Sequence, residues 1–354
     1  MNNFKKLMAA VAAAEIDALM LESPVNRQYA SGFDASDGVA IITANKAWFF
    51  TDSRYIEAAQ NTISDAEVLM VSRDWPYSRR INDVIDSERI KKLGFEENRT
   101  TYSAFTKWKE KVNAELVPAE SIITDLRAVK TPEELEFLIQ SQRTAEKSFN
   151  EILPMISTDI TEKELATELL YRFQKNGAED KSFDSIIVSG PHSSMPHGVP
   201  CDEKIVNGFL TIDFGVRKNG WCSDTTRTLC VGKPTDEMRR VYDIVLEAQL
   251  AGIAAAHAGA TGSEIDGAAR AVIEKAGYGE EFGHGFGHGV GLEIHEAPYA
   301  SPSCDDPIPA GAVISAEPGI YLPGRFGVRI EDVIYITENG CVDITELPKE
   351  LIIL

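Results

Sequence analysis

The sequence predicts an α+β protein in which a smaller α/β domain precedes a larger α+β domain. Three observations lead to this prediction. Short apolar strands alternate with helical segments early in the chain, a strong helix start stands at Thr131, and residues 183–231 and 312–346 are rich in short strands and Gly/Asn turns. Since 354 residues suffice for two separate cores, we place the domains at residues 1–127 and 128–354.

The first domain alternates helices with strands. Apolar runs rich in β-branched and aromatic residues, bounded by turn residues, are typical of strands. Amphipathic segments between them are typical of helices. The strands are expected at residues 18–21, 39–43, 47–51, 66–71 and 92–96, and the helices at 4–16, 53–60 and 81–90.

Two capping signals mark the start of the second domain. Thr131 is expected to cap a helix that has Pro132 at its first position and Glu134 as the capping partner. Thr161 and Glu164 repeat the pattern one helix later. Two further helices are expected within residues 235–276, on either side of Gly259 to Gly262.

Composition narrows the function classes. A net charge of −20 disfavours nucleic acid and anionic membranes as partners, because both require a basic surface. The five cysteines form no CxxC pair, so neither a disulfide scaffold nor a thiolate zinc site is indicated, and a reducing cytoplasm fits best. The N-terminal apolar tract is interrupted by Glu15 and Asp17, and we interpret it as an amphipathic helix.

Three of the six histidines fall within residues 281–297, where five glycines separate them. So many glycines disfavour a helix, so His284 and His288 are not a helical pair of zinc ligands. Strand alternation would place residues 284, 286 and 288 on one face, with glycines allowing close approach of a ligand or another backbone. A glycine-rich turn that merely carries histidines is the alternative.

Two aspartates lie in the arms of a predicted hairpin. Asn219-Gly220 is a strong signal for a two-residue turn, and it pairs residue 218 with 221 and residue 213 with 226. Asp213 and Asp224 then point to the same face as diagonal neighbours. Two buried acids repel each other unless a cation compensates their charge, which favours a metal. Alternatively, Asp224 is exposed or caps a turn, and Asp213 bonds to backbone.

Two glutamates are embedded in apolar, strand-forming sequence further on. Glu317 ends an apolar run directly before Pro318-Gly319, and Glu331 stands inside the strand predicted from residue 326. A salt bridge between Glu331 and Arg329, two residues away on the same strand face, is the alternative for that residue.

Charge counting indicates how many metals this set of side chains would hold. Four carboxylates in one core would face a prohibitive loss of hydration. Two divalent ions bring the four carboxylates to neutrality, whereas one ion does not. Oxygen ligands with a single imidazole suit Mn²⁺, with Co²⁺, Fe²⁺ or Zn²⁺ as alternatives. The candidate ligands are Asp213, Asp224, His288, Glu317 and Glu331.

With these residues in this order, the chain resembles the pita-bread metallopeptidases, in their Xaa-Pro aminopeptidase (aminopeptidase P) and prolidase branch. The family's five metal ligands fall on the motifs TIDFG, SDTTRT, GHGVG, AEPG and RIED. The resemblance implies a pita-bread catalytic domain over residues 128–354. It also implies a creatinase-type N-terminal domain over residues 1–127, carried by NRQYASGFDASDGVAIIT and FTDSRYIEAA.

The resemblance also implies residues outside the metal ligands. His197 of MPHG would stand at the substrate entrance, His295 of EIHE would bond the scissile group, and His284 would be a further pocket histidine. His197 could instead be merely exposed, and His284 could serve packing. Glu317 would accept a proton from the attacking water and return it to the proline nitrogen, while His295 stabilises the oxyanion.

The function so implied is metal-assisted hydrolysis of the N-terminal Xaa-Pro bond of peptides by a cytoplasmic homodimer with two metal ions. The alternatives are an Xaa-Pro dipeptidase (prolidase), a methionine aminopeptidase, and a metal-free adaptor. Several microbial prolidases carry an arginine four residues after the outer histidine, where this chain has Tyr299. No Arg or Lys occurs between His295 and Glu317, so we expect longer peptides to be preferred, with Arg329 the remaining candidate for binding a dipeptide's carboxylate.

Overall fold

The computed structural model describes residues 2–354. The chain divides into a first compact unit that ends at Arg127 and a second, Ala128–Leu354. Within the described residues, no helix has both the length and the apolar character needed to cross a membrane.

The first unit is built on one six-stranded mixed sheet, in the order β4-β3-β2-β1-β5-β6. Three predicted strands are confirmed to the residue, and their side chains are buried, which is why their apolar runs are continuous rather than alternating. The strands are β1 (Ala18–Leu21), β2 (Val39–Thr43), β3 (Ala47–Thr51), β4 (Glu67–Met70), β5 (Lys92–Phe95) and β6 (Glu115–Pro118).

Helices connect these strands, and some differ from the prediction. The first helix stops at Ala13 because Ala14 already has extended backbone, and the fourth begins at Tyr77, directly after Pro76. The second was not predicted because its sequence is polar, although Ser23 caps it. The helices are α1 (Phe4–Ala13), α2 (Pro24–Ser31), α3 (Ile56–Thr62), α4 (Tyr77–Glu88), α5 (Tyr102–Lys111) and α6 (Glu120–Ala128).

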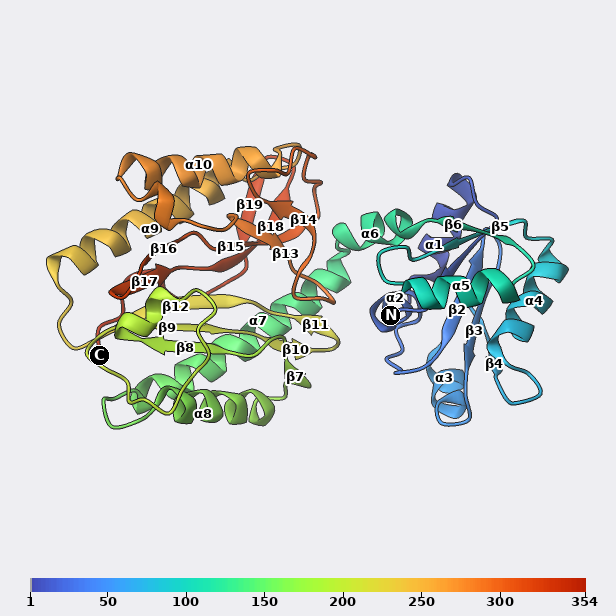
Figure 1. Cartoon of the computed structure of the whole chain (residues 1–354), viewed down its shortest axis with the longest axis horizontal. Helices are drawn as coiled ribbons and strands as arrows, with labels where there is room; N and C mark the ends of the chain where they lie inside the picture. Colours follow the sequence, from blue (N-terminus) through green and yellow to red (C-terminus); the bar gives the residue numbers. More distant parts are fainter. Residues whose placement is uncertain (1) are drawn as a thin grey trace. The chain divides into compact units, whose positions relative to one another are not determined.

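In the second unit, two pairs of helices enclose the strands (Figure 1). The capping boxes predicted at Thr131 and Thr161 are confirmed, and Thr261 forms a third. The helices are α7 (Pro132–Ile152), α8 (Glu162–Lys175), α9 (Asp236–Ala255) and α10 (Gly262–Lys275), with 3-10 turns η1 (Leu153–Met155), η2 (Gly190–Ser194) and η3 (Gly279–Glu281).

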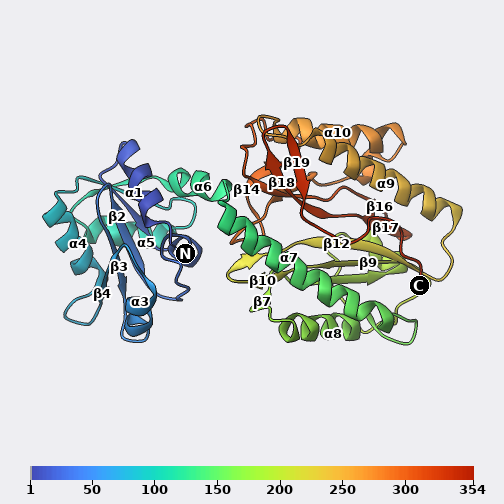
Figure 2. The ribbon, with the colours of Figure 1, turned by 180° about the vertical axis from the view of Figure 1, so that it is seen from behind.

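The strands of the second unit form several small sheets. A three-stranded sheet, β12-β9-β8, lies against α7 and α8, and a five-stranded sheet, β14-β13-β15-β18-β19, belongs to the side of α9 and α10 (Figure 2). The strands are β7 (Asp180–Lys181), β8 (Ile186–Ser189), β9 (Gly208–Phe214), β10 (Val216–Lys218), β11 (Trp221–Cys222), β12 (Thr225–Val231), β13 (Gly287–Gly289), β14 (Glu296–Ala300), β15 (Val313–Ala316), β16 (Gly319–Leu322), β17 (Phe326–Arg329), β18 (Asp332–Thr337) and β19 (Gly340–Asp343).

Each helix pair has its own apolar core. Phe149 of α7 stacks on Phe214 of β9 with ring centroids 5.0 Å apart, within a cluster that also includes α8. On the other side, Phe286 packs with α9 and α10. Glycine at position 252 of α9 is required there, because a Cβ atom would lie 2.3 Å from the Phe286 ring. The strands that lie between the two helix pairs therefore pack against these two cores.

Candidate metal centre

The hairpin predicted from Asn219-Gly220 forms in the predicted register. Lys218 pairs with Trp221, and Asp213 pairs with Thr226. The two turn residues have φ values of 53° and 79°, as a type I′ turn requires. Asp213, at the end of β9, and Asp224, directly before β12, consequently line the same cavity.

The histidine-rich segment is less regular than strand alternation suggests. Only Gly287–Gly289 form a strand, β13, which pairs with β14 on one side and β15 on the other. His284 and His288 both line the cavity, but Phe286 does not share their face and is packed in the core. The prediction of one common face for 284, 286 and 288 is therefore wrong, because a three-residue strand cannot carry the alternation back to residue 284.

Glycine is needed on both sides of His288. A Cβ atom at Gly287 would lie 2.0 Å from the carbonyl oxygen of Ser315, and one at Gly289 would lie 2.4 Å from that of Glu296. The close packing of β13 between its neighbours thus accounts for the repeated glycines. It also fixes the position from which the imidazole of His288 reaches the cavity.

The two glutamates lie at the ends of strands. Glu317 directly follows β15, and its N–H donates to the carbonyl of Phe286 at 2.8 Å. Glu331 lies between β17 and β18, not inside a continuous strand as predicted, because the chain passes there from the two-stranded sheet β16-β17 to the five-stranded sheet. Its N–H donates to the carbonyl of Thr226 at 3.1 Å.

The structure brings all five candidate ligands to one cavity of about 870 Å³. Ligand atoms of Asp224, His288 and Glu331 all lie within 4.8 Å of one another. The Nε2 atom of His288 is 3.2 Å from Oε1 of Glu317 and 3.6 Å from Oδ2 of Asp224. Among the described residues, Oδ1 of Asp213 is buried without a hydrogen-bond partner. A buried, unpartnered carboxylate oxygen beside three other carboxylates fits the coordination of divalent cations.

Burial and mutual repulsion dominate the electrostatics of the acids. Burial and the neighbouring Asp213 raise the pKa of Asp224 well above its usual value, and burial and Asp224 do the same for the pKa of Glu331. Burial raises the pKa of Asp213 as well, although the Arg329 guanidinium opposes it. These carboxyls are costly to ionise together without compensating positive charge.

His288 and Glu317 behave as an ion pair within this cluster. Burial opposes both charges, but their mutual hydrogen bond and attraction outweigh it. The pKa of His288 rises to about 9 and that of Glu317 falls to about 2. One imidazolium does not offset the charge of the other carboxylates, so the cluster still favours the binding of cations.

Neighbouring side chains orient the candidate ligands. Thr226 Oγ1 donates to Oε2 of Glu331 at 2.7 Å, and Ser315 Oγ donates to Oε1 of Glu317 at 3.0 Å. His288 Nδ1 lies 3.2 Å from the carbonyl of Gly289, which makes Nδ1 the donor and directs Nε2 at the acids.

The three outer histidines also line the cavity. His295 meets His288 edge to face, with ring centroids 4.2 Å apart, and burial together with the His288 charge lowers the pKa of His295. His284 is held by Tyr321, whose hydroxyl is 3.0 Å from Nε2, and burial lowers the pKa of His284. His197 is exposed, on the segment that follows η2.

The cationic residues of the cavity differ from the sequence-based expectation. Arg329 lines the cavity but is buried, donating to Asp213 at 2.6 Å and to the Tyr321 hydroxyl at 2.7 Å instead of pairing with Glu331. Tyr299 lines it too, with 46% of its surface exposed. Lys163 and Lys181 line the cavity as well, and sequence reasoning missed them because only the tertiary fold brings α8 and β7 to its wall.

The fold and this cavity define a metallopeptidase of the pita-bread type, with an α/β domain before the catalytic one. Residues 136–338 match metallopeptidase family M24, and residues 4–129 match the creatinase/prolidase N-terminal domain. The chain belongs to metallopeptidase family M24 and is a hydrolase of that family.

Relatives place it among the Xaa-Pro peptidases of the family. It is 38% identical to a protein named Xaa-Pro dipeptidase from Pyrococcus furiosus, over 98% of this chain and 99% of the relative. A solved structure of an Xaa-Pro dipeptidase from Bacillus anthracis matches with a TM-score of 0.95 and 41% identity, covering 99% of each chain. An X-Pro aminopeptidase from Thermotoga maritima matches with a TM-score of 0.91 and 36% identity, covering 98% of this chain and 99% of that one.

Proposed function

We propose that the protein is an Xaa-Pro dipeptidase, which departs from the preference for longer peptides expected from the sequence. That expectation rested on the absence of Arg and Lys between His295 and Glu317. The observation that supports the dipeptidase is the presence of Lys163, Lys181 and Arg329 on the wall of the same cavity. The names of the relatives from Pyrococcus furiosus and Bacillus anthracis support it further.

Two of these cations are suited to a substrate carboxylate. Arg329 is already engaged by Asp213 and Tyr321. Lys163 pairs at 3.4 Å with Asp202, whose side chain is 86% exposed, and Lys181 pairs with Asp184, whose side chain is 91% exposed. Exposed ion pairs are worth only about 0–1 kcal/mol, so an incoming carboxylate competes readily with these aspartates. We assign the free carboxylate of the dipeptide to Lys163 or Lys181.

Two divalent ions complete the proposed centre, with Mn²⁺ the best matched to its oxygen-rich ligands and Co²⁺, Fe²⁺ or Zn²⁺ as alternatives. When bound, the ions would activate water and polarise the scissile carbonyl. The set of ligands proposed to hold them is Asp213, Asp224, His288, Glu317 and Glu331, and the unpartnered oxygen of Asp213 supports it.

The proposed catalytic roles follow from position. We assign proton acceptance to Glu317, because its carboxylate lies in the cavity 3.2 Å from Nε2 of His288 and is ionised at neutral pH. His295 is the donor to the developing oxyanion, because its ring is next to His288 at the cavity wall. His197 contacts the substrate at the entrance, and His284, fixed by Tyr321, shapes the pocket together with Tyr299.

The test compares kcat/KM for Ala-Pro, Ala-Pro-Ala and Ala-Pro-amide on Mn²⁺-loaded enzyme. Ala-Pro should have the highest kcat/KM, because its free carboxylate can bind Lys163 or Lys181. The amide keeps the shape of the dipeptide but lacks this charge. In Lys163→Met or Lys181→Met the advantage of Ala-Pro over the amide should fall at least about tenfold, since one charge-assisted hydrogen bond is worth roughly 1.5–3 kcal/mol. Lys175→Met, an exposed change on the same helix as Lys163, is the control. Equal kcat/KM for the amide and the dipeptide would contradict the dipeptidase and support the Xaa-Pro aminopeptidase predicted from the sequence.

We further propose a cytoplasmic homodimer in which residues 1–127 and 128–354 are the two domains. The five free cysteines support a reducing compartment, and the division of the chain after Arg127 supports the boundary. Light scattering on the purified enzyme tests the dimer. Metal analysis alongside the proline-release assay separates the peptidase from a metal-free adaptor.

A further inference from the structure

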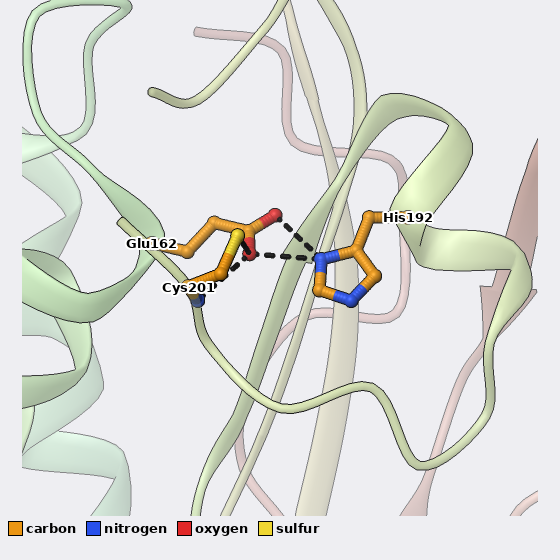
Figure 3. A group of neighbouring side chains, drawn as sticks. All are labelled: Glu162, His192 and Cys201. Carbon is orange, nitrogen blue, oxygen red and sulfur yellow. Dashed lines mark hydrogen bonds and ion pairs between the residues drawn. The ribbon is translucent and has the colours of Figure 1, made fainter. Parts of the chain in front are cut away.

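A second cluster of metal-ligating side chains lies where α8 begins (Figure 3). Glu162 is the first residue of α8, His192 belongs to η2, and Cys201 follows in the next loop. The Nδ1 atom of His192 is 2.9 Å from Oε2 of Glu162, and the Sγ atom of Cys201 is 3.2 Å from the same oxygen. The three ligand atoms all lie within 4.8 Å of one another.

The carboxylate of Glu162 is buried and held in a fixed orientation. The backbone N–H of Ser189 donates to Oε1 at 2.7 Å, and that of Cys201 donates to Oε2 at 3.3 Å. These backbone bonds do not depend on the imidazole or the thiol. They provide the kind of outer support that metal-binding carboxylates have in proteins.

The two separations that involve Oε2 of Glu162 are close to those of a coordinated ion. Zn²⁺ bonds of about 2.0–2.3 Å to N, O and S in a tetrahedron place the ligand atoms roughly 3.3–3.6 Å apart. The observed distances of 2.9 and 3.2 Å are those of hydrogen bonds to the carboxylate. An outward shift of a few tenths of an ångström brings these two pairs to coordination distances, and Nδ1 and Sγ already lie within 4.8 Å of each other. His192, with 26% of its side chain exposed, leaves a path from solvent.

We propose that Glu162, His192 and Cys201 bind one thiophilic divalent cation, with Zn²⁺ the best matched, at a site separate from the carboxylate-rich centre. On binding, the thiol of Cys201 releases its proton to solvent, and neutral His192 presents its Nδ1 lone pair while Nε2 carries the ring proton. The thiolate and the carboxylate then balance the two charges of the ion. Water takes the fourth position.

The site would also fix part of the cavity wall. His197 lies between His192 and Cys201 in the sequence, and residues 196–200 line the large cavity. The N–H of Lys163 donates to the carbonyl of Cys201 at 3.0 Å, and His192 contacts Glu162, so hydrogen bonds already connect both ends of this segment to α8. An ion bound to Glu162, His192 and Cys201 would replace the side-chain hydrogen bonds by coordination bonds and hold the segment that carries His197 more firmly.

The test is a Co²⁺ titration of the full-length, Mn²⁺-loaded enzyme, followed by the sulfur-to-cobalt charge-transfer band in the near ultraviolet. None of the five ligands of the carboxylate-rich centre is a cysteine, so the band reports a thiolate site outside that centre, whichever metal fills it, and the variants below show whether the thiolate is Cys201. The wild type should develop the band as Co²⁺ is added to saturation, and excess Zn²⁺ should abolish it by competition.

Two variants keep the hydrogen bonds to Glu162 while removing a ligand. Cys201→Ser retains a donor and should lose the band. His192→Gln retains a donor and should weaken Co²⁺ binding at least about tenfold. Cys304→Ser, at another partly exposed thiol, is the control and should keep the band. Unchanged thermal unfolding of the variants confirms that they fold. A wild type without the band, or a band that persists in Cys201→Ser, overturns the proposal and leaves the cluster as a hydrogen-bonded anchor.

Discussion

Arg329 donates from Nη2 to Oδ2 of Asp213 at 2.6 Å, and both side chains are buried. This pair occupies one oxygen of Asp213 and leaves the other, Oδ1, for a cation. It also changes the charge balance of the centre. Counting only carboxylates, two divalent ions give neutrality, but the guanidinium leaves one net positive charge. That charge favours an anionic ligand in the centre, which suits hydrolysis by ionised water.

Glu331→Gln should lower the metal content by about one ion per chain and abolish activity, while stabilising the metal-free protein. A carboxyl whose pKa is raised on folding disfavours the folded state once the pH exceeds its unfolded pKa, near 4.3. The melting temperature of the metal-free variant should therefore exceed that of the metal-free wild type at pH 8, and the difference should shrink toward pH 5. Asp213→Ala should likewise lose about one ion and activity.

Glu338→Gln, at an exposed position, is the matched control and should change neither property. Metal analysis and thermal unfolding of chelator-treated protein give both readouts. Full activity with two bound ions in Glu331→Gln would remove Glu331 from the centre.

His288→Ala and His295→Ala should separate metal binding from catalysis, although the two rings touch. His288→Ala should lose metal. His295→Ala should keep its metal and lower kcat by roughly 10²-fold or more, as loss of an oxyanion donor does. Metal content and steady-state kinetics on the same preparations decide the matter, and identical behaviour of the two variants would refute the assignment.

Metal binding to the metal-free enzyme should release protons at pH 7. The pKa of His288 is about 9, so its imidazole is protonated at pH 7 and must lose that proton before Nε2 can bind an ion. Apparent affinity should therefore rise with pH up to about 9. Calorimetric titrations in two buffers with different heats of ionisation count the protons. A proton count of zero at pH 7 would contradict the His288–Glu317 ion pair as the resting state.

Gly287→Ala should lower metal content and stability together. Its Cβ atom would lie 2.0 Å from the backbone oxygen of Ser315, so β13 must shift and take His288 with it. Gly283→Ala is the control within the same segment, because its Cβ atom would meet nothing within 4 Å. Thermal unfolding and metal analysis of both variants test the argument, which fails if the two behave alike.

Local signals were the most informative part of the sequence. The strands at residues 39–43 and 47–51 are bounded as predicted because their β-branched and aromatic runs end at turn residues. The Asn219-Gly220 turn fixed the register that brings Asp213 and Asp224 to one face, because a two-residue turn leaves only one pairing.

Features that depend on tertiary structure were not predictable. The interruption of the strand at Glu331 reflects a change of sheet partner rather than any residue that breaks strands. Lys163 gives no sequence signal, because its place on the cavity wall depends on how α8 packs. The absence of a CxxC pair argued against thiolate ligation, yet folding brings Cys201 to His192 and Glu162 from separate segments.

The position of Glu331 between two sheets has a mechanical consequence. Asp213 and Asp224 belong to the hairpin on the side of α7 and α8. His288 lies in β13 and Glu317 directly follows β15, both strands of the five-stranded sheet, and Glu331 lies in the connection between β17 and β18, where the chain passes from one sheet to the other. Ions bound by these residues would connect the hairpin to the five-stranded sheet within the second unit. Removal of the ions by a chelator should then increase amide hydrogen exchange in β13 and in the connection between β17 and β18. The enclosing helices should still be protected from exchange at that stage.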